Sequence, residues 1–372
     1  MKVCILGTAW PYRGGLTAMN ERLAKEFVDQ GHEVEIVTFT MQYPSIFFPG
    51  KSQFDDRSQP DLKIKRMLSS VNPLTWIRVG NYLRTSSPDL IIVKYWIPFM
   101  APAFGTVLRR AKKNTSIKVV SILDNIIPHE KRPFDFSLSN YFVKSVDGFI
   151  TLSKSVLQDL EQFDMLKPRK FSPHPVYDSF GSIEAKQDAR RRLGLDPGGK
   201  FILFFGFIRD YKGLDLLLKA MAEAKVRDSD IRLIVAGEYY SNQEEYHSLI
   251  ESLKIEDKLD LFTSFIPDNE IAHYFNAADC VVQPYKTATQ SGVTQIAYHF
   301  EKPMIVTNVG GLPEIVPDGE VGYVCEVDPA SIASSILEFY EDDVDRFSSN
   351  IKAKQKEYSW GTMLENVLSL VE

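Results

Sequence analysis

Residues 201–214 combine the pattern of a buried strand with two cations at its end. The run FILFFGFIRDYKGL is apolar as far as Ile208 and then carries Arg209 and Lys212 in a short loop. A continuous apolar run is typical of a strand covered on both faces of a parallel sheet, and such strands present ligands at their carboxyl ends. Apolar residues repeat at helical spacing from Leu214 onward, so the positive end of a helix lies beside the two cations. The pattern predicts an anion site, for which a diphosphate is the natural ligand; the alternative is a solvated rim of the sheet.

Glycines support the same interpretation at two places. Gly206 lets the backbone of this run approach a ligand closely. Gly14 and Gly15 follow a strand expected at 2–6, a position where backbone amides can face a phosphate. Their spacing does not match a dinucleotide fingerprint, and no Gly-Lys-Ser or Gly-Lys-Thr follows them directly, so this loop is not a Walker loop. For Gly14 and Gly15 the alternative is a tight structural turn.

A third group of small polar residues precedes a helix expected near residue 292. Hydroxyl side chains and glycine at a helix start form a cradle for phosphate or sugar, with an ordinary helix cap as the alternative for Ser291. Another loop, VGGLPE at 309–314, follows the next strand. Because parallel strands end at the same edge of their sheet, we expect these loops to share one edge with Arg209 and Lys212. The candidate binding residues there are Gly206, Thr289, Ser291, Gly292, Val293 and Gln295.

Length and composition indicate a two-domain globular protein. With 372 residues the chain is too long for one core of ordinary size, and its 44% hydrophobic and 25% charged residues are normal for a soluble protein. The three cysteines lie far apart in apolar surroundings, which predicts buried free thiols and a reducing compartment. The amino terminus lacks a signal-peptide pattern, and Lys94 and prolines interrupt the apolar stretch 90–108. We therefore expect a cytoplasmic protein without a membrane span.

Charge is divided unevenly along the chain. Residues 1–175 hold 24 Lys and Arg against 16 Asp and Glu, whereas the remainder holds 19 against 33. Such basic character favours an anionic bilayer or an anionic lipid carrier as a partner, with solvated helix ends as the alternative, and we expect no nucleic acid. The local clusters are formed by Lys63, Lys65 and Arg66 and by Arg109, Arg110, Lys112 and Lys113.

Strands and helices alternate in both halves of the chain, which predicts repeated βα units and a doubly wound parallel sheet in each. A proline-containing connection at 171–177 separates the two series. We expect strands at 2–6, 34–39, 90–94, 118–123 and 148–152, then at 201–207, 232–236, 259–262, 280–283, 304–307 and 322–324. The helices expected in the first half lie at 16–30, 75–83, 103–111 and 140–146, and a last amphipathic helix opens near residue 359.

The combination of loops resembles the family 4 glycosyltransferases, bacterial enzymes of the GT-B fold that build surface polysaccharides and glycolipids. GFIR and YKGL within 206–214 carry the resemblance, together with Gly14 and Gly15, VGGLPE and the glycines of 319–322. The resemblance spans nearly the whole chain. It implies an α/β protein with two Rossmann-like domains that face each other across a cleft. The implied segments are an acceptor-side domain at 1–175, a donor-binding domain at 176–356 and a helix at 357–372 that crosses back to the first domain.

The resemblance also assigns roles at the donor site. Arg209 and Lys212 would neutralise the leaving diphosphate, and the Gly14 and Gly15 loop would close on the same group. The family usually carries two glutamates before a Gly-x-Pro, and this chain has Ala288 and Ile296 in their places. Neutral groups can still hydrogen-bond a sugar or a ribose, although less strongly than a carboxylate. The polar candidates to replace the glutamates are Thr289, Ser291 and Gln295.

A second departure lies after the strand expected at 118–123. Asp124 stands where family members often have a histidine, and His129 follows a few residues later. The resemblance makes Asp124 a candidate to accept the proton of an acceptor hydroxyl. His129 becomes a candidate to bind the donor sugar or orient the acceptor. A loop cap or a surface residue is the alternative for each.

The expected function is retaining transfer of a hexose from a nucleotide diphosphate sugar, UDP- or GDP-linked, to a hydroxyl of a lipid-linked or growing glycan. Arg209, Lys212 and the amides of Gly15 and Gly292 would stabilise the charge that develops on the diphosphate, a role that needs no metal ion or other cofactor. A peripheral position at the inner face of the plasma membrane would suit this function. The alternatives are a nucleotide-sugar 2-epimerase of similar fold and a catalytically inert binding subunit.

Overall fold

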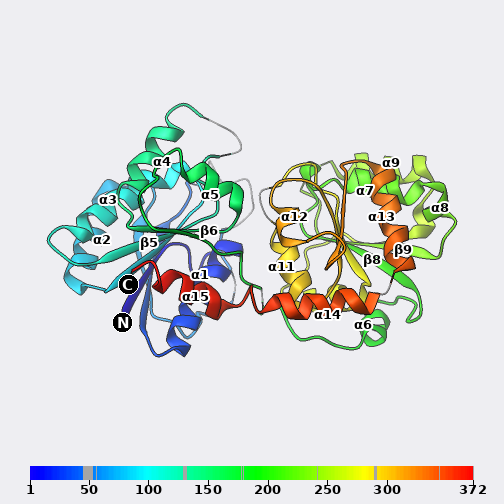
Figure 1. Cartoon of the computed structure of the whole chain (residues 1–372), viewed down its shortest axis with the longest axis horizontal. Coiled ribbons are helices and arrows are strands. Elements are labelled where there is room, and N and C mark those ends of the chain that lie inside the picture. Colours follow the sequence, from blue (N-terminus) through cyan, green and yellow to red (C-terminus); the bar gives the residue numbers. More distant parts are fainter. Residues whose placement is uncertain are drawn as a thin grey trace. The chain divides into compact units, whose positions relative to one another are not determined.

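The computed structural model describes residues 1–44, 53–55, 57–128, 132–176, 178, 180–240, 242–288, 291–342 and 344–371. The chain divides into two compact units: the first is formed by Met1–Pro173 with Trp360–Glu372, and the second by His174–Ser359. Each unit is a sheet with helices on both faces (Figure 1). The chain therefore passes between the units twice, once in each direction.

The first unit contains a seven-stranded sheet in the order β3-β2-β1-β4-β5-β6-β7. All of its neighbouring strands are parallel, as repeated βα units require. The central strands are apolar and buried, because helices cover both of their faces. The strands are β1 (Lys2–Leu6), β2 (Glu33–Met41), β3 (Ile64–Ser69), β4 (Leu90–Tyr95), β5 (Lys118–Leu123), β6 (Gly148–Thr151) and β7 (Arg169–Phe171).

Two helical layers enclose this sheet (Figure 1). One layer packs on the core that includes Phe104 and Phe142; it consists of α2 (Pro73–Ser86), α3 (Ala101–Lys112), α4 (Asp135–Val143) and α5 (Lys154–Leu160). The other consists of α1 (Gly15–Asp29) and the carboxyl-terminal α15 (Trp360–Leu368). Met363 and Val367 of α15 are buried in this second core, and the Arg22 guanidinium of α1 lies 5.1 Å from the Trp360 ring centroid. The carboxyl-terminal helix is thus part of the first unit.

The second unit contains a six-stranded sheet in the order β10-β9-β8-β11-β12-β13, again with parallel neighbours. Its strands are β8 (Lys200–Phe205), β9 (Ile231–Ala236), β10 (Leu259–Phe262), β11 (Cys280–Gln283), β12 (Met304–Thr307) and β13 (Gly322–Cys325). One face packs on α6 (Lys186–Arg192), α10 (Ile271–Ala277), α11 (Gly292–His299) and α12 (Leu312–Ile315). The other packs on α7 (Leu214–Ala222), α8 (Ala224–Arg227), α9 (Gln243–Leu253) and α13 (Pro329–Glu341), and α14 (Val344–Gln355) contributes to both cores.

The predicted class, α/β with two doubly wound parallel sheets, is confirmed. The prediction missed two strands, β3 and β7. Each lies at an edge of the sheet and contains two adjacent charged residues, which break the apolar pattern of a buried strand. Lys63 and Lys65, interpreted as a free basic cluster, lie at β3 and pair with carboxylates of β2: Lys65 Nζ lies 3.0 Å from Glu35, and Lys63 Nζ lies 3.6 Å from Glu33 and Glu35.

The cysteines and the apolar stretch behave as expected. Cys4, Cys280 and Cys325 are buried free thiols, and burial raises the pKa of each. Residues 90–108 form β4, a short 3₁₀ turn and part of α3. Within the described ranges, no helix combines the length and the apolar character needed to cross a bilayer.

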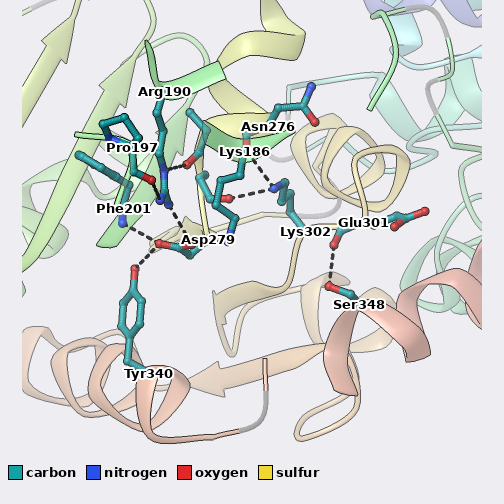
Figure 2. A network of polar contacts seen from close by, with 12 residues as sticks. Lys186, Arg190, Pro197, Phe201, Asn276, Asp279, Glu301, Lys302, Tyr340 and Ser348 are labelled. Atoms are coloured by element: carbon teal, nitrogen blue, oxygen red, sulfur yellow. Dashed lines mark hydrogen bonds and ion pairs between the residues drawn. The ribbon is translucent and has the colours of Figure 1, made fainter. Parts of the chain in front are cut away.

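A buried ionic network ties the second unit together at the amino-terminal edge of its sheet (Figure 2). Asp279, the residue before β11, accepts hydrogen bonds from Lys186 Nζ at 2.6 Å and Arg190 Nη2 at 3.0 Å. It also accepts from the Phe201 backbone NH at 2.8 Å and from the Tyr340 hydroxyl at 3.1 Å. One carboxylate therefore joins α6, β8, β11 and α13.

Asp279→Ala should lower the free energy of unfolding of the second unit by about 3–5 kcal/mol, because the buried Arg190 guanidinium and the half-buried Lys186 ammonium lose their counter-charge. Asp230→Ala is the matched control: its partner Lys200 is 2.9 Å away, but both side chains are exposed, so the loss should stay below about 1 kcal/mol. Urea unfolding followed by circular dichroism measures both. Equal losses would show that the network contributes no more than a surface pair.

Candidate functional site

Three loops that carry predicted site residues lie at one edge of the second sheet. They follow β8, β11 and β12, which are neighbours in the sheet and parallel, so their carboxyl ends coincide. The loops are also hydrogen-bonded to each other: the Lys286 backbone NH donates to the Tyr211 carbonyl at 2.7 Å. A Cβ on Gly213, whose φ is 70°, would stand 1.9 Å from the Pro284 carbonyl oxygen. Glycine is therefore required where the β8 loop passes the end of β11.

Arg209 and Lys212 lie where the sequence pattern places them, between β8 and α7. A Cβ on Gly206, with φ 97°, would stand 2.8 Å from Lys212 Nζ and 3.9 Å from Val293 Cγ2 of α11. The structure thus brings together three predicted residues, Gly206, Lys212 and Val293. The Arg209 guanidinium carbon lies 4.0 Å from the Tyr240 ring centroid, which holds the side chain over an aromatic face.

The two cations have no carboxylate partner within the described residues. Neither side chain makes a hydrogen bond or an ion pair there, and the nearby acids are engaged elsewhere: Lys286 Nζ lies 2.7 Å from Asp210 and 3.0 Å from Asp215. Burial and, after it, the neighbouring Arg209 charge together lower the pKa of Lys212 to about 8. Two half-buried positive charges side by side favour binding of an anion, which would relieve both effects.

Residues at the start of α11 complete this edge. The Ser291 hydroxyl accepts a hydrogen bond from the Val293 NH at 3.2 Å and lies 3.1 Å from the Tyr285 hydroxyl. Tyr285 is buried, and its ring centroid lies 5.8 Å from Lys212 Nζ. Ser291 is therefore a helix cap, which was the alternative interpretation of this residue. Through Tyr285 it also lies close to Lys212. Gly292 is the first residue of α11.

The side-chain amides of Gln295 and Gln283 are fully buried. Neither amide group has a hydrogen-bond partner among the described residues, although burying an amide without one costs free energy. Gln295 lies in α11 and Gln283 ends β11. Gln283 was missed by the sequence analysis; a glutamine that closes a strand otherwise made of Cys-Val-Val is the signal that would have found it. Thr289 lies outside the described residues.

In the first unit, Gly14 and Gly15 form the exposed start of α1. Gly14 is the cap residue, with φ 106° and no side chain to satisfy the first amides of the helix. The buried hydroxyls of Thr8 and Thr17, on either side of this loop, also have no hydrogen-bond partner in the part of the chain that the structure describes. The loop therefore offers unsatisfied donors around the positive end of a 15-residue helix.

Asp124 forms an ion pair that the sequence analysis did not anticipate. Its carboxylate lies 3.0 Å from Nζ of Lys94, a buried residue near the end of β4 that also contacts the Met19 sulfur. Burial raises the pKa of Asp124, and Lys94 opposes this shift. A carboxylate with a raised pKa at the carboxyl edge of a sheet suits a proton acceptor. A single cation inside the apolar run LIIVKY is the sequence signal that would have pointed to Lys94. His129 lies outside the described residues.

Lys94→Met should destabilise the first unit by about 3–5 kcal/mol, because it leaves the Asp124 carboxylate without its partner. Asp124→Asn should also destabilise the first unit, because it leaves the buried Lys94 ammonium without its partner. The double variant Lys94→Met/Asp124→Asn should lose less than the sum of the two single losses, a coupling that a double-mutant cycle in urea measures directly. Strictly additive losses would mean that the pair is not a functional unit of the fold.

The lowered pKa of Lys212 predicts that the stability of the folded protein depends on pH. The unfolded chain holds this proton up to the ordinary value of 10.5, whereas the folded chain releases it from about 8, so wild-type stability should rise between these pH values. Lys212→Met removes the desolvated charge; it should be more stable than wild type at pH 7, with the difference shrinking toward pH 10.5. Lys219→Met, on the exposed side of α7, is the control. The same pH profile in both variants would contradict the assignment.

Solved structures define the class of fold. HepE from Anabaena, solved in complex with UDP, matches with a TM-score of 0.73 and 17% sequence identity, over 99% of this chain and 99% of that chain. At this identity the match describes the fold alone: two Rossmann-like units of the GT-B type.

Sequence comparisons identify the family. The model for glycosyl transferases group 1 matches residues 185–358, and the model for glycosyltransferase family 4 matches residues 13–172. The chain belongs to these family 4, group 1 glycosyltransferases.

Two curated relatives differ in their coverage. A D-inositol 3-phosphate glycosyltransferase from Corynebacterium aurimucosum is 32% identical over 198 residues, 50% of this chain and 47% of that protein. The chain thus matches about half the length of that relative. An N-acetyl-alpha-D-glucosaminyl L-malate synthase from Bacillus anthracis is 23% identical over 378 residues, 96% of this chain and 93% of that protein.

Proposed function

We propose that the protein is a retaining glycosyltransferase that moves a hexose from a nucleotide diphosphate sugar to a hydroxyl group. One observation carries the proposal: Arg209 and Lys212 stand without a carboxylate partner among the described residues, beside Gly206 and the start of α11. The family supports it, as do the relatives, which include a D-inositol 3-phosphate glycosyltransferase, and a structural neighbour solved with UDP and with UDP-glucose.

The proposed mechanism rests on charge that develops during the reaction. When the bond between the anomeric carbon and the phosphate oxygen breaks, the electron pair leaves with the diphosphate, and its negative charge grows. Arg209, Lys212 and the amides of Gly15 and Gly292 would stabilise this charge more in the transition state than in the ground state. Asp124 is the proposed acceptor for the proton of the attacking hydroxyl. In this proposal protein groups neutralise the diphosphate, and no metal ion is required.

The proposed donor is UDP- or GDP-linked, and its sugar and ribose would meet neutral side chains. Ser291 and Gln295 would form hydrogen bonds in place of the missing glutamates, together with Thr289. The unsatisfied amide of Gln295 supports this role, because it can both donate and accept without disturbing an existing hydrogen bond among the described residues. Neutral contacts bind less tightly than carboxylates, so the two cations would carry more of the donor affinity.

The proposed acceptor is a lipid-linked or growing glycan in surface polysaccharide synthesis. This proposal places the protein in the cytoplasm, peripherally at the inner face of the membrane where a lipid-linked acceptor is available. The basic character of residues 1–175 supports it.

Incubation with labelled nucleotide sugars tests the activity, after thermal-shift screening of UDP-, GDP-, ADP- and dTDP-sugars has selected the donor. Arg209→Gln and Lys212→Gln should each lower transfer and donor hydrolysis by about 10²–10³-fold, the loss expected when one preorganised donor of this kind is removed. Lys219→Gln removes a positive charge from the exposed side of α7 and should leave the rate unchanged.

Each contrary outcome has a distinct meaning. Full activity of Lys212→Gln would remove the cation from the mechanism. Conversion of the nucleotide sugar into its epimer without an acceptor would identify an epimerase, and binding without any turnover would identify an inert subunit.

A further inference from the structure

The helical layer formed by α2, α3 and α4 presents apolar side chains to solvent. This layer covers one face of the first sheet (Figure 1), and we call its outer surface the α2–α3–α4 face. Leu74 is 76% exposed and Ile77 45% exposed at the start of α2, and Phe136 is 54% exposed at the start of α4. Exposing large apolar side chains to water is unfavourable, and covering them with a membrane or another protein lowers the free energy.

Charge on α2 and α3 has one sign, and Asp135, the first residue of α4, is the one acid within the three helices. Residues 62–123 contain eleven Lys and Arg but a single acid, Asp89, and neither α2 nor α3 contains Asp or Glu. Among the described residues, no carboxylate pairs with the side chains of Arg78, Arg84, Arg109 or Arg110. Arg110 instead donates to the Asn81 side chain at 2.7 Å, and Arg109 to the Gly105 carbonyl at 3.1 Å.

Glycines pack the three helices into one continuous surface. A Cβ on Gly80 of α2 would stand 2.5 Å from Arg110 Cβ of α3, and a Cβ on Gly105 of α3 would stand 2.6 Å from the Tyr141 ring of α4. The Arg109 guanidinium carbon lies 3.7 Å from the Tyr141 ring centroid, which joins α3 to α4. The cations and the apolar side chains are thus carried by one closely packed layer rather than by separate mobile segments.

We propose that the α2–α3–α4 face docks on an anionic phospholipid bilayer. The four arginines would contact lipid phosphates, while Leu74, Ile77 and Phe136 would enter the interface between headgroups and acyl chains. Charge complementarity selects this partner: a second copy of the same face would be repelled, and a nucleic acid would leave the apolar side chains in water. Lys63 and Lys65 contribute little, because Glu33 and Glu35 already neutralise them.

The inference deepens the proposed function, since a lipid-linked acceptor lies at such a surface. Its test needs no substrate, so the two proposals fail separately. If the protein transfers sugar to a soluble acceptor but does not bind vesicles, only the docking proposal is refuted. Vesicle binding without transfer would refute the activity alone.

Co-sedimentation with phosphatidylcholine vesicles, with and without phosphatidylglycerol, measures the docking. The full chain should bind only the vesicles that contain phosphatidylglycerol, and added salt should weaken binding. Arg78→Gln should lower the partition coefficient by about fivefold, as expected for one cation near an anionic surface. Leu74→Glu should lower it by at least about tenfold, because an apolar contact is replaced by a like-charged one.

Two matched controls locate the surface. Val28→Glu changes a side chain that is 45% exposed in α1, and Lys25→Gln removes a positive charge from the same helix, on the other face of the sheet. Both variants should bind vesicles as wild type does, and circular dichroism checks that all variants are folded.

Three outcomes would overturn the proposal: no binding of wild type to phosphatidylglycerol vesicles, equal losses in Leu74→Glu and Val28→Glu, or equal losses in Arg78→Gln and Lys25→Gln. Sedimentation of wild type as a dimer that Leu74→Glu converts to a monomer would also overturn it, because the face would then be a contact between two copies.

Discussion

Parallel pairing of every strand is the constraint on which both units depend. A parallel sheet sends all of its strands in one direction, so every loop that leaves a carboxyl end reaches the same edge. In the second unit this brings Lys212 against Gly206 and beside Val293, although 81 positions separate Lys212 from Val293 in the chain. The opposite edge of the sheet carries structural ion pairs, formed by Asp279 with Lys186 and the buried Arg190.

The elements that the sequence predicts well are those buried on both faces. Nine strands have the expected bounds or differ by one residue at one end, among them β11 and β12, whose short apolar runs have few other interpretations. The edge strands β3 and β7 could not be recognised, because each contains adjacent charged residues whose partners, such as Glu35 of β2, are known only once the sheet is assembled. Buried ion pairs cannot be predicted from the sequence for the same reason: nothing relates Lys94 to Asp124 until β4 and β5 lie side by side.

Pairing of charges separates the structural cations from the candidate functional ones. Lys186, Arg190 and Lys286 are held by carboxylates and fix the loops and helices around them. Lys212 has no such partner in the described part of the chain, and burial makes its proton easier to lose. An isolated, desolvated cation lowers the stability of the folded state, so its retention at the edge of the sheet fits a ligand-binding role better than a structural one. From the sequence alone, these cations look alike.

The placement of α15 in the first unit also affects how the chain folds during synthesis. Trp360, Met363 and Val367 cover the same face of the first sheet as α1, yet they are translated after the whole second unit. A ribosome that has completed residue 173 has therefore released a sheet with one apolar face only partly covered. That face stays open while the following 186 residues of the second unit are made. Nascent chains with exposed apolar surface are prone to aggregate, so the first unit should need chaperone protection until its last helix arrives.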